Sequence, residues 1–162
     1  IIAGGIILIV IVLASSSYIK EQQTVHLNYL SQDLIKILSA LTVKEANNEY
    51  LNSLIASNDI TNPDNTILEQ ISEFWAKNSE DGMEMANKSF TNLTEPFVPN
   101  IIGFGLWIDN ETIYQRNIPV KKSLVSAKKI ISGIKKGKAS QQTRENPPTL
   151  WGPVIAEVRA WD

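Results

Sequence analysis

The N-terminal stretch of the chain, IIAGGIILIVIVLASSSYIK, contains no charged side chain before Lys20. As an α-helix, residues 1–19 would rise about 28 Å, which is close to the thickness of the hydrocarbon core of a bilayer. The stretch lacks the basic residues that open a secretory signal peptide, and it is longer than the usual apolar core of one. We therefore expect residues 1–19 to form a single membrane-spanning segment.

Beyond Lys20 the apolar residues follow a helical repeat. Residues 20–56 contain neither proline nor glycine, and the first cluster of helix-stopping residues is SNDITNPDN at 57–65. The sequence therefore predicts one helix over residues 1–57, about 55 residues and roughly 80 Å long. It would be apolar on all sides over 1–19 and on one side only over 20–57. Steps of three and four residues separate most members of the apolar stripe, which are Leu27, Leu30, Leu34, Ile37, Leu38, Leu41, Tyr50, Leu51, Leu54 and Ile55.

The next two segments predict a helix and a β-hairpin. Apolar residues at helical spacing indicate a second, shorter helix over residues 66–92. The segment IIGFGLWIDNETIYQRN, residues 101–117, predicts two strands joined by a turn near 109–111. Gly103 and Gly105 in the first strand are expected to allow close packing against the long helix, or to form a bulge.

Two further segments predict strands. The segment IPVKKSLVSAKKIISGIKKGK, residues 118–138, fits a helix through a few isoleucines and leucines, but its valines and serines favour a strand that ends at Gly133. The final segment WGPVIAEVRAWD, residues 151–162, alternates in the manner of a half-buried strand. One side would carry Val154, Ala156, Val158 and Ala160, and the other Ile155, Glu157, Arg159 and Trp161.

The order of these elements predicts an α+β fold. A long N-terminal helix over residues 1–57, hydrophobic and then amphipathic, would support a globular head over residues 58–162. The head would hold the second helix and a small antiparallel sheet of three to four strands, laid on the inner face of the long helix.

Sites of chemistry are few in this sequence. It contains no cysteine, which excludes a disulfide scaffold, a thiolate zinc site and a cysteine nucleophile. His26 is the only histidine, and Glu80, Asp81 and Glu84 lack the spacing of an EF-hand, so we expect solvated helix surfaces at both places. No nucleophile–base spacing, phosphate-binding loop or carboxylate pair is evident. We therefore expect neither enzymatic activity nor a metal or cofactor.

The tryptophans and the N-glycosylation sequons are candidates for interaction or modification. Tryptophans could form a sugar-stacking platform, but three of the four lie in expected regular structure, which favours core positions. The tryptophans are Trp75, Trp107, Trp151 and Trp161. An exported chain could carry N-linked glycan at three sequons. The sequons begin at Asn87, Asn92 and Asn110.

Charge is divided unevenly along the chain. Residues 1–100 hold five basic and twelve acidic side chains, whereas residues 101–162 hold ten basic and five acidic ones. The basic run could be a solvated sheet edge that discourages strand pairing, or a surface that faces the acidic half of a neighbouring subunit. We do not expect nucleic-acid binding, because aromatic residues are not interleaved with the lysines. The candidate inter-subunit surface consists of Lys121, Lys122, Lys128, Lys129, Lys135, Lys136 and Lys138.

The uncharged start, the continuous hydrophobic-to-amphipathic helix and the small β head together resemble type IV pilins and their relatives. Bacterial pilins usually carry a glutamate a few residues into the hydrophobic segment, whereas the first acidic residue here is Glu21. Archaeal pilins and pilin-like surface proteins lack that glutamate. The chain resembles the archaeal proteins in particular through the segments ILEQISEFW, EPFVPNIIGFGLWIDNETIY, SAKKIISG and WGPVIAEVRAW.

This resemblance implies cleavage by a prepilin peptidase just before the hydrophobic run, which would account for the missing methionine. It also implies residence in the membrane before assembly, a pilus assembly machinery, and self-assembly into a helical extracellular filament. The core of that filament would be built from the bundled N-terminal helices. The residues expected in the core are Ile1, Ile2, Ile6, Ile7, Leu8, Ile9, Val10, Ile11, Val12 and Leu13.

Two functional hypotheses follow from the sequence. The first is a structural subunit of a type IV pilus-like filament at the cell surface, used for adhesion or surface attachment. The second is a single-span membrane protein with an extracytoplasmic sensory or ligand-binding domain. A short basic leader upstream of residue 1 would favour the first, and a cytoplasmic signalling segment there would favour the second.

Overall fold

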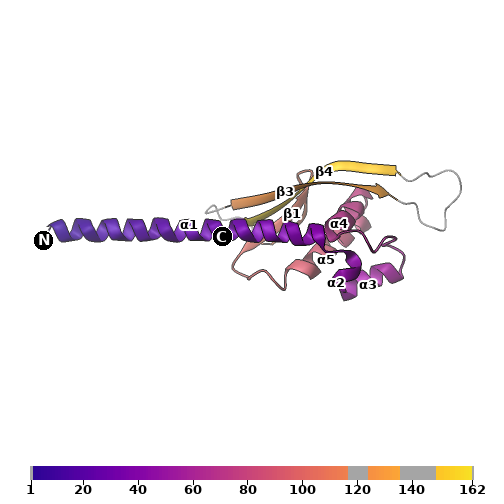
Figure 1. Ribbon diagram of the computed structural model, residues 1–162, viewed down its shortest axis with the longest axis horizontal. Coiled ribbons are helices and arrows are strands. Elements are labelled where there is room, and N and C mark those ends of the chain that lie inside the picture. Colours follow the sequence, from indigo (N-terminus) through magenta and orange to yellow (C-terminus); the bar gives the residue numbers. More distant parts are fainter. Residues whose placement is uncertain (1, 117–123, 136–148, 162) are drawn as a thin grey trace.

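The chain folds into an α+β structure. The computed structural model describes the backbone of residues 2–116, 124–135 and 149–161, and the side chains of residues 21–116, 124–133 and 152–161. This part of the chain contains five helices and one four-stranded antiparallel sheet (Figure 1). The helices are α1 (Ile2–Ala40), α2 (Val43–Ala46), α3 (Glu49–Ala56), α4 (Ile67–Ala76) and α5 (Glu80–Thr94). The strands are β1 (Gly103–Ile108), β2 (Glu111–Arg116), β3 (Leu124–Lys135) and β4 (Thr149–Trp161).

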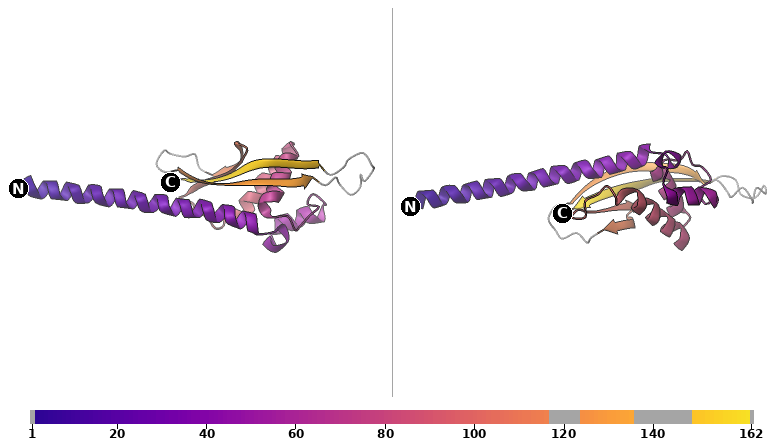
Figure 2. Two further views of the ribbon diagram at one scale, coloured as in Figure 1. Left: turned by 45° about the horizontal axis from the view of Figure 1, so that its top comes forward. Right: turned by 90° about the horizontal axis from the view of Figure 1, so that it is seen from below.

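Helix α1 is continuous through Lys20, as the sequence predicts. Its C-terminal half runs along β3 and β4, and its N-terminal half extends beyond the rest of the molecule (Figures 1 and 2). The expected apolar stripe is confirmed in that C-terminal half, where the buried members are Leu27, Leu34 and Leu38. Ile35 is buried in place of Ile37, which stays exposed at the margin of the stripe.

The expected span and filament core fall on residues 1–20. Their side chains lie outside the described residues, so the core positions from Ile1 to Leu13 remain expectations. No helix is long and apolar enough to cross a membrane among the residues whose side chains the structure describes.

The prediction of one unbroken helix over residues 1–57 is wrong. Helix α1 ends at Ala40, and Thr42 begins α2 with extended backbone angles. The Thr42 hydroxyl accepts from the Glu45 backbone N–H, while the Glu45 carboxylate accepts from the Thr42 N–H. This reciprocal capping box satisfies donors that a helix start leaves open, so a new helix begins without a proline or glycine.

A second interruption follows after four residues of α2. Asn47 adopts a left-handed conformation, with φ of 43°, which asparagine tolerates better than most residues. The Asn48 side chain then accepts hydrogen bonds from the backbone N–H groups of Tyr50 and Leu51, and so caps α3. The chain therefore turns twice between residues 41 and 48, where apolar periodicity alone predicts a straight helix.

The expected second helix over residues 66–92 is also divided, into α4 and α5. Thr66 and Glu69 form a capping box at the start of α4. Asn78 has a φ of 49°, and the Ser79 hydroxyl accepts from the Gly82 N–H at the start of α5. The same mechanism thus operates again: short polar side chains bond locally to the backbone and restart the helix.

The sheet confirms the predicted hairpin and the predicted final strand. Strand order is β2-β1-β4-β3, with every pair antiparallel, so β4 lies at the centre of the sheet. Asp109 and Asn110 form the two-residue turn between β1 and β2, and both have positive φ, as turns of this length favour. Strand β3 confirms the strand alternative and extends past Gly133 to Lys135.

One face of the sheet packs on the helices. The side of β4 predicted to be buried is confirmed, because Val154, Ala156, Val158 and Ala160 are all buried and belong to the main core. The other side is only partly open, since Ile155 is exposed whereas Glu157 and Trp161 are buried as well. Phe90 of α5 lies at the centre of an aromatic cluster, with ring centroids 5.8 Å from Phe104 and 5.5 Å from Tyr114. This cluster joins α5 to the hairpin.

Gly103 and Gly105 do not face the long helix, contrary to the first of the two alternatives in the sequence. A Cβ atom at Gly103 would overlap the indole of Trp161, and one at Gly105 would lie 2.7 Å from the Trp107 ring. Both glycines therefore make room for tryptophans on the sheet face that points away from the helices. The second alternative, a bulge formed by the glycines, is not observed either, because the β1–β2 register shifts between Leu106 and Trp107 and leaves Ile113 of β2 as the extra residue.

Candidate functional site

An apolar groove lies where the C-terminal end of α1 meets the C-terminal end of α5. It has a volume of about 420 Å³, which is within the usual range for binding pockets. No charged side chain lines it among the described residues. We call this feature the apolar groove and define it by Leu34, Ile37, Leu41, Leu93, Pro96 and Phe97.

Two large apolar side chains of the groove remain open to solvent. The exposed fraction is 55% for Ile37 and 80% for Phe97. Single exposed apolar residues are ordinary on protein surfaces, but exposed apolar residues that rim a hollow are typical of interaction sites. The groove is therefore the strongest candidate for an interaction site on the described surface.

The loop after α5 holds Phe97 in its exposed position. The Phe97 N–H donates to the Thr94 carbonyl, and the next side chain, Val98, is buried. The Arg116 guanidinium donates to the carbonyl oxygens of Val98, Pro99 and Ile102, and it lies 4.4 Å from the Phe104 ring centroid. Arg116 thus fixes the loop, so Phe97 has little freedom to fold inward.

Sequence reasoning did not find the groove. Its signal is Phe97, an aromatic residue between two prolines in the segment EPFVPN, outside any helical or strand repeat. An apolar residue with no periodic partner has no obvious core face, and this would have marked it for attention. Ala46, Asn47 and Asn48 also line the groove, because the chain turns after α1, and the unbroken-helix prediction ruled out that turn.

The sheet face opposite the helices carries a cluster of tryptophan and charged side chains. Trp107 and Trp161 are buried, with exposed fractions of 7% and 3%, and their ring centroids are 6.1 Å apart. The Arg159 guanidinium lies 4.4 Å from the Trp107 ring centroid and donates to the Glu157 carboxylate at 2.8 Å. The expectation of core tryptophans is confirmed for these two.

The other two tryptophans differ. Trp75 is half-buried, and its indole N–H donates to the Glu111 carboxylate at 2.6 Å. The side chain of Trp151 lies outside the described residues. A sugar-stacking platform is therefore not formed by the tryptophans that the structure places on the sheet.

Glu157 is the ionisable centre of this cluster. The hydrogen bond from Arg159 lowers the pKa of the carboxyl group below its ordinary value of 4.5, against the opposing effect of burial, with help from Ser126 and Lys128. Because the pKa of Glu157 is lower in the folded chain than in the unfolded chain, the carboxylate stabilises the fold fully at a pH above its ordinary pKa. This stabilisation is lost as the pH falls through the lowered pKa of the folded chain.

We expect Glu157→Gln to lower the free energy of unfolding near pH 7, because a neutral amide binds Arg159 more weakly than a carboxylate does. The difference from the wild type should shrink as the pH falls from about 5 towards 3, where the wild-type carboxylate also becomes neutral. Urea unfolding of the wild type and of Glu157→Gln at a series of pH values from 3 to 9 measures this difference in the free energy of unfolding. Between pH 7 and 9 the difference should stay constant, and a difference that is constant over the whole range would contradict the prediction.

The candidate basic surface is not one patch where the structure describes it. Lys128 pairs across the sheet with Glu157, and its ammonium lies 3.7 Å from that carboxylate. Lys129 pairs with Ala156, so it points to the opposite face of the sheet. The remaining members, Lys121, Lys122, Lys135, Lys136 and Lys138, lie outside the residues whose side chains are described.

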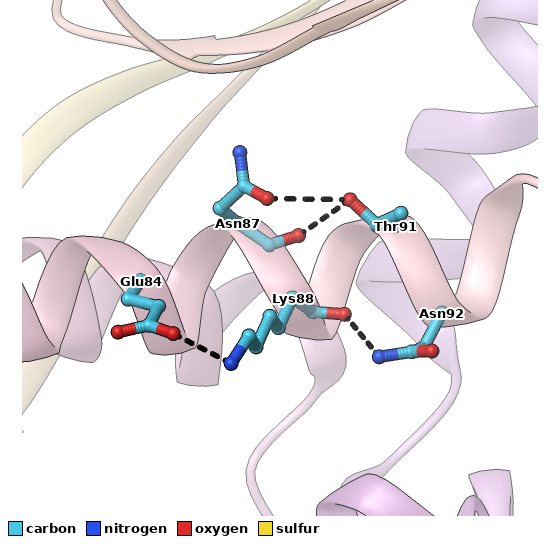
Figure 3. A network of polar contacts seen from close by, with 5 residues as sticks. All are labelled: Glu84, Asn87, Lys88, Thr91 and Asn92. Atoms are coloured by element: carbon cyan, nitrogen blue, oxygen red, sulfur yellow. Dashed lines mark hydrogen bonds and ion pairs between the residues drawn. The ribbon is translucent and has the colours of Figure 1, made fainter.

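The three sequons differ sharply in their surroundings. The Asn87 amide donates to the Ile113 carbonyl at 2.8 Å. Figure 3 shows the Thr91 hydroxyl, which donates to the Asn87 backbone carbonyl on the same helix. The Asn92 amide donates to the Lys88 carbonyl one turn earlier (Figure 3). Asn110 lies in the β1–β2 turn, where it and the rest of its sequon, Glu111 and Thr112, are exposed.

We therefore expect glycan at Asn110 when the chain is exported by cells that N-glycosylate, and none at Asn87 or Asn92. Acceptor asparagines lie in surface loops, whereas Asn87 and Asn92 lie within helix α5, where their amides donate to backbone carbonyls. Mass spectrometry of the intact protein should show one glycan mass, which Asn110→Gln removes. Asn92→Gln is the matched control and should leave the mass of the glycan in place. Glycopeptides containing Asn87 would contradict the prediction.

His26 and the acidic cluster lie on exposed helix surfaces. His26 is exposed on α1, and Glu80 and Asp81 open α5, where carboxylates suit the positive end of the helix dipole. Glu84 pairs with Lys88 one turn later, at 2.5 Å (Figure 3). No group of three histidine or carboxylate side chains that could hold a metal ion occurs within the described part of the chain.

Comparison with protein-family models, with curated proteins and with solved structures gives no match.

Proposed function

We propose that this protein is a structural subunit of an extracellular type IV pilus-like filament that serves adhesion or surface attachment. The observation that best supports this proposal is the course of α1. This helix continues from Ile2 to Ala40, and its N-terminal half extends beyond the head (Figures 1 and 2). That half corresponds to the stretch without a charged side chain. A helix that is apolar on all sides is stable only when it is covered by lipid or by other helices.

The proposed life of the subunit has two stages. The helix over residues 1–19 first resides in the membrane, where a length of about 28 Å suits the hydrocarbon core. It then moves into a bundle of identical helices, driven by a pilus assembly machinery. The resemblance to archaeal pilin-like proteins supports this sequence of events, as does the lack of a charge that would oppose transfer in either direction.

The head fits a structural role. The described residues of the head contain a closely packed core and the apolar groove. The ionisable side chains described above form salt bridges, helix caps or contacts across the sheet. We therefore propose a role in which the head presents a surface along the filament, with self-association of the chain as its principal interaction.

Electron microscopy of the protein purified from its own cells, and of the cell surface, tests this proposal. We expect filaments that bind an antibody raised against the head. A protein that stays monomeric in membranes, with no filament that contains it, would overturn the proposal and favour a single-span receptor. The gene sequence upstream of residue 1 is an independent check, because a basic leader and a cytoplasmic domain are easily distinguished.

A further inference from the structure

We propose that the apolar groove binds the uncharged helical segment, residues 1–19, of a second copy of this chain. The inference rests on the proposed filament function and adds a specific contact to it. In this contact the head of one subunit binds the N-terminal helix of another.

The groove is suited to a helix. Leu34 and Ile37 lie near the end of α1, and Leu41 follows directly after it with its N–H still bonded to the Ile37 carbonyl, so steps of three and four residues place the three in a row. Leu93 and Phe97, at the end of α5 and just beyond it, form the opposite wall. A row of this kind is the surface on which the ridges of a second helix pack.

The chemistry of the groove selects an uncharged partner. Because no charged side chain lines it among the described residues, a charged partner would lose hydration and gain no counter-ion. Residues 1–19 form the longest stretch of the sequence without a charged side chain, and most of them are isoleucine, valine or leucine. The two surfaces therefore match, and each covers apolar area that the other leaves open.

The partner has to be another copy, because the groove and the segment belong to one helix. Residues 34 and 19 are fifteen residues apart on the continuous helix α1, a separation of about 22 Å along its axis. A chain cannot fold its own segment back into its own groove without breaking that helix. Only the segment of a second subunit can reach the groove while α1 stays intact.

The contact predicts how neighbouring subunits are offset. In a filament whose subunits share one orientation, residue 9 of one copy beside Ile37 of the next staggers the two α1 helices by 28 residues, or about 40 Å. Phe97, held outward by its loop, would then close over the partner helix. The preformed position of Phe97 reduces the loss of side-chain freedom on binding.

Cysteine cross-linking in the full-length protein tests this contact, because residues 1–162 contain no cysteine that would interfere. One copy carries Phe97→Cys, and the other carries Ile6→Cys, Ile9→Cys or Leu13→Cys, which sample successive turns of the helix. The two copies are expressed together in assembling cells and oxidised. At least one pair should give a disulfide-linked dimer at ten times or more the yield obtained with Ile130→Cys in place of Phe97→Cys. Ile130 is the matched control because it is 71% exposed but lies on β3, outside the groove.

A charge in the groove gives a second measurement. Phe97→Asp should reduce the mass of filaments at least tenfold, whereas Ile130→Asp should leave it close to wild type. Normal filaments of Phe97→Asp, without any cross-link in the scan, would overturn the docking contact while the filament function stands. Absence of filaments from the wild-type protein would instead overturn the proposed function and the docking contact together.

Discussion

Replacing Ile9 by aspartate should abolish filaments while the head stays folded. A charged side chain at the middle of a membrane-spanning helix costs about 2.5–3.5 kcal/mol on insertion scales. An unpaired charge in a helix bundle is unfavourable for the same reason, and the cost recurs in every subunit. Because 1.4 kcal/mol corresponds to a tenfold change in an equilibrium constant, the population of membrane-inserted subunits that can assemble should fall on the order of a hundredfold.

Counting filaments by electron microscopy, with the amount of protein in the membrane measured alongside, checks this result. The matched control is Gln23→Asp, which places the same charge on an exposed residue of the same helix, beyond the apolar segment. That variant should assemble as the wild type does. Equal numbers of filaments for Ile9→Asp and Gln23→Asp would show that residues 1–19 do not form a dry core.

Replacing Phe90 by alanine should destabilise the head by about 3–5 kcal/mol, the usual cost of truncating a buried phenylalanine. Phe90 is 0% exposed and contacts the rings of Phe104 and Tyr114. The change would leave a cavity where α5 joins the hairpin, and the surrounding rings cannot close it without moving a strand. Against the 5–15 kcal/mol stability typical of domains, the loss is a large part of the total.

The chain supplies its own control for this prediction. Phe97→Ala makes the same chemical change seven residues later, at the exposed rim of the apolar groove, and should alter the free energy of unfolding by less than about 0.5 kcal/mol. Urea unfolding followed by tryptophan fluorescence distinguishes the two. A similar loss of stability in both variants would contradict the packing of α5 on the hairpin.

The contrast between these two phenylalanines also separates fold from function. Phe90 should be essential for stability and Phe97 nearly neutral, whereas a polar change at Phe97 should act on assembly. A buried side chain contributes through the area that folding removes from water. An exposed one contributes only when a partner covers it.

Several elements could be predicted because their signals are local. The alternation in residues 151–162 predicted which side of β4 joins the main core, and the Asp109-Asn110 pair marked the hairpin turn, since both residues tolerate positive φ. The stripe through Leu27, Leu34 and Leu38 predicted the buried side of α1. In each case the types of neighbouring residues favour a backbone conformation, or determine which face of the element is buried, within a few positions of the sequence.

The breaks within the helices were missed although their signals are equally local. Thr42 and Glu45 form a capping box in the middle of an apolar repeat, and Asn47 and Asn48 reverse the chain two residues later. Periodicity of apolar residues continues across both interruptions, because α1 and α3 each present an apolar side to the same core. A repeat alone therefore does not show whether a helix is straight, and capping residues have to be weighed beside it.

By itself, the sequence determined the uncharged helix at the front, the amphipathic stripe behind it, the hairpin and the alternation of the last strand, because charge, period and turn preference are properties of neighbouring residues. Only the tertiary structure decided that β4 lies between β1 and β3, that Gly103 and Gly105 face tryptophans, and that Ile37 and Phe97 border one groove. These features depend on contacts between residues far apart in the chain. Local preferences do not distinguish the possible arrangements there, and packing and loop geometry determine which one forms.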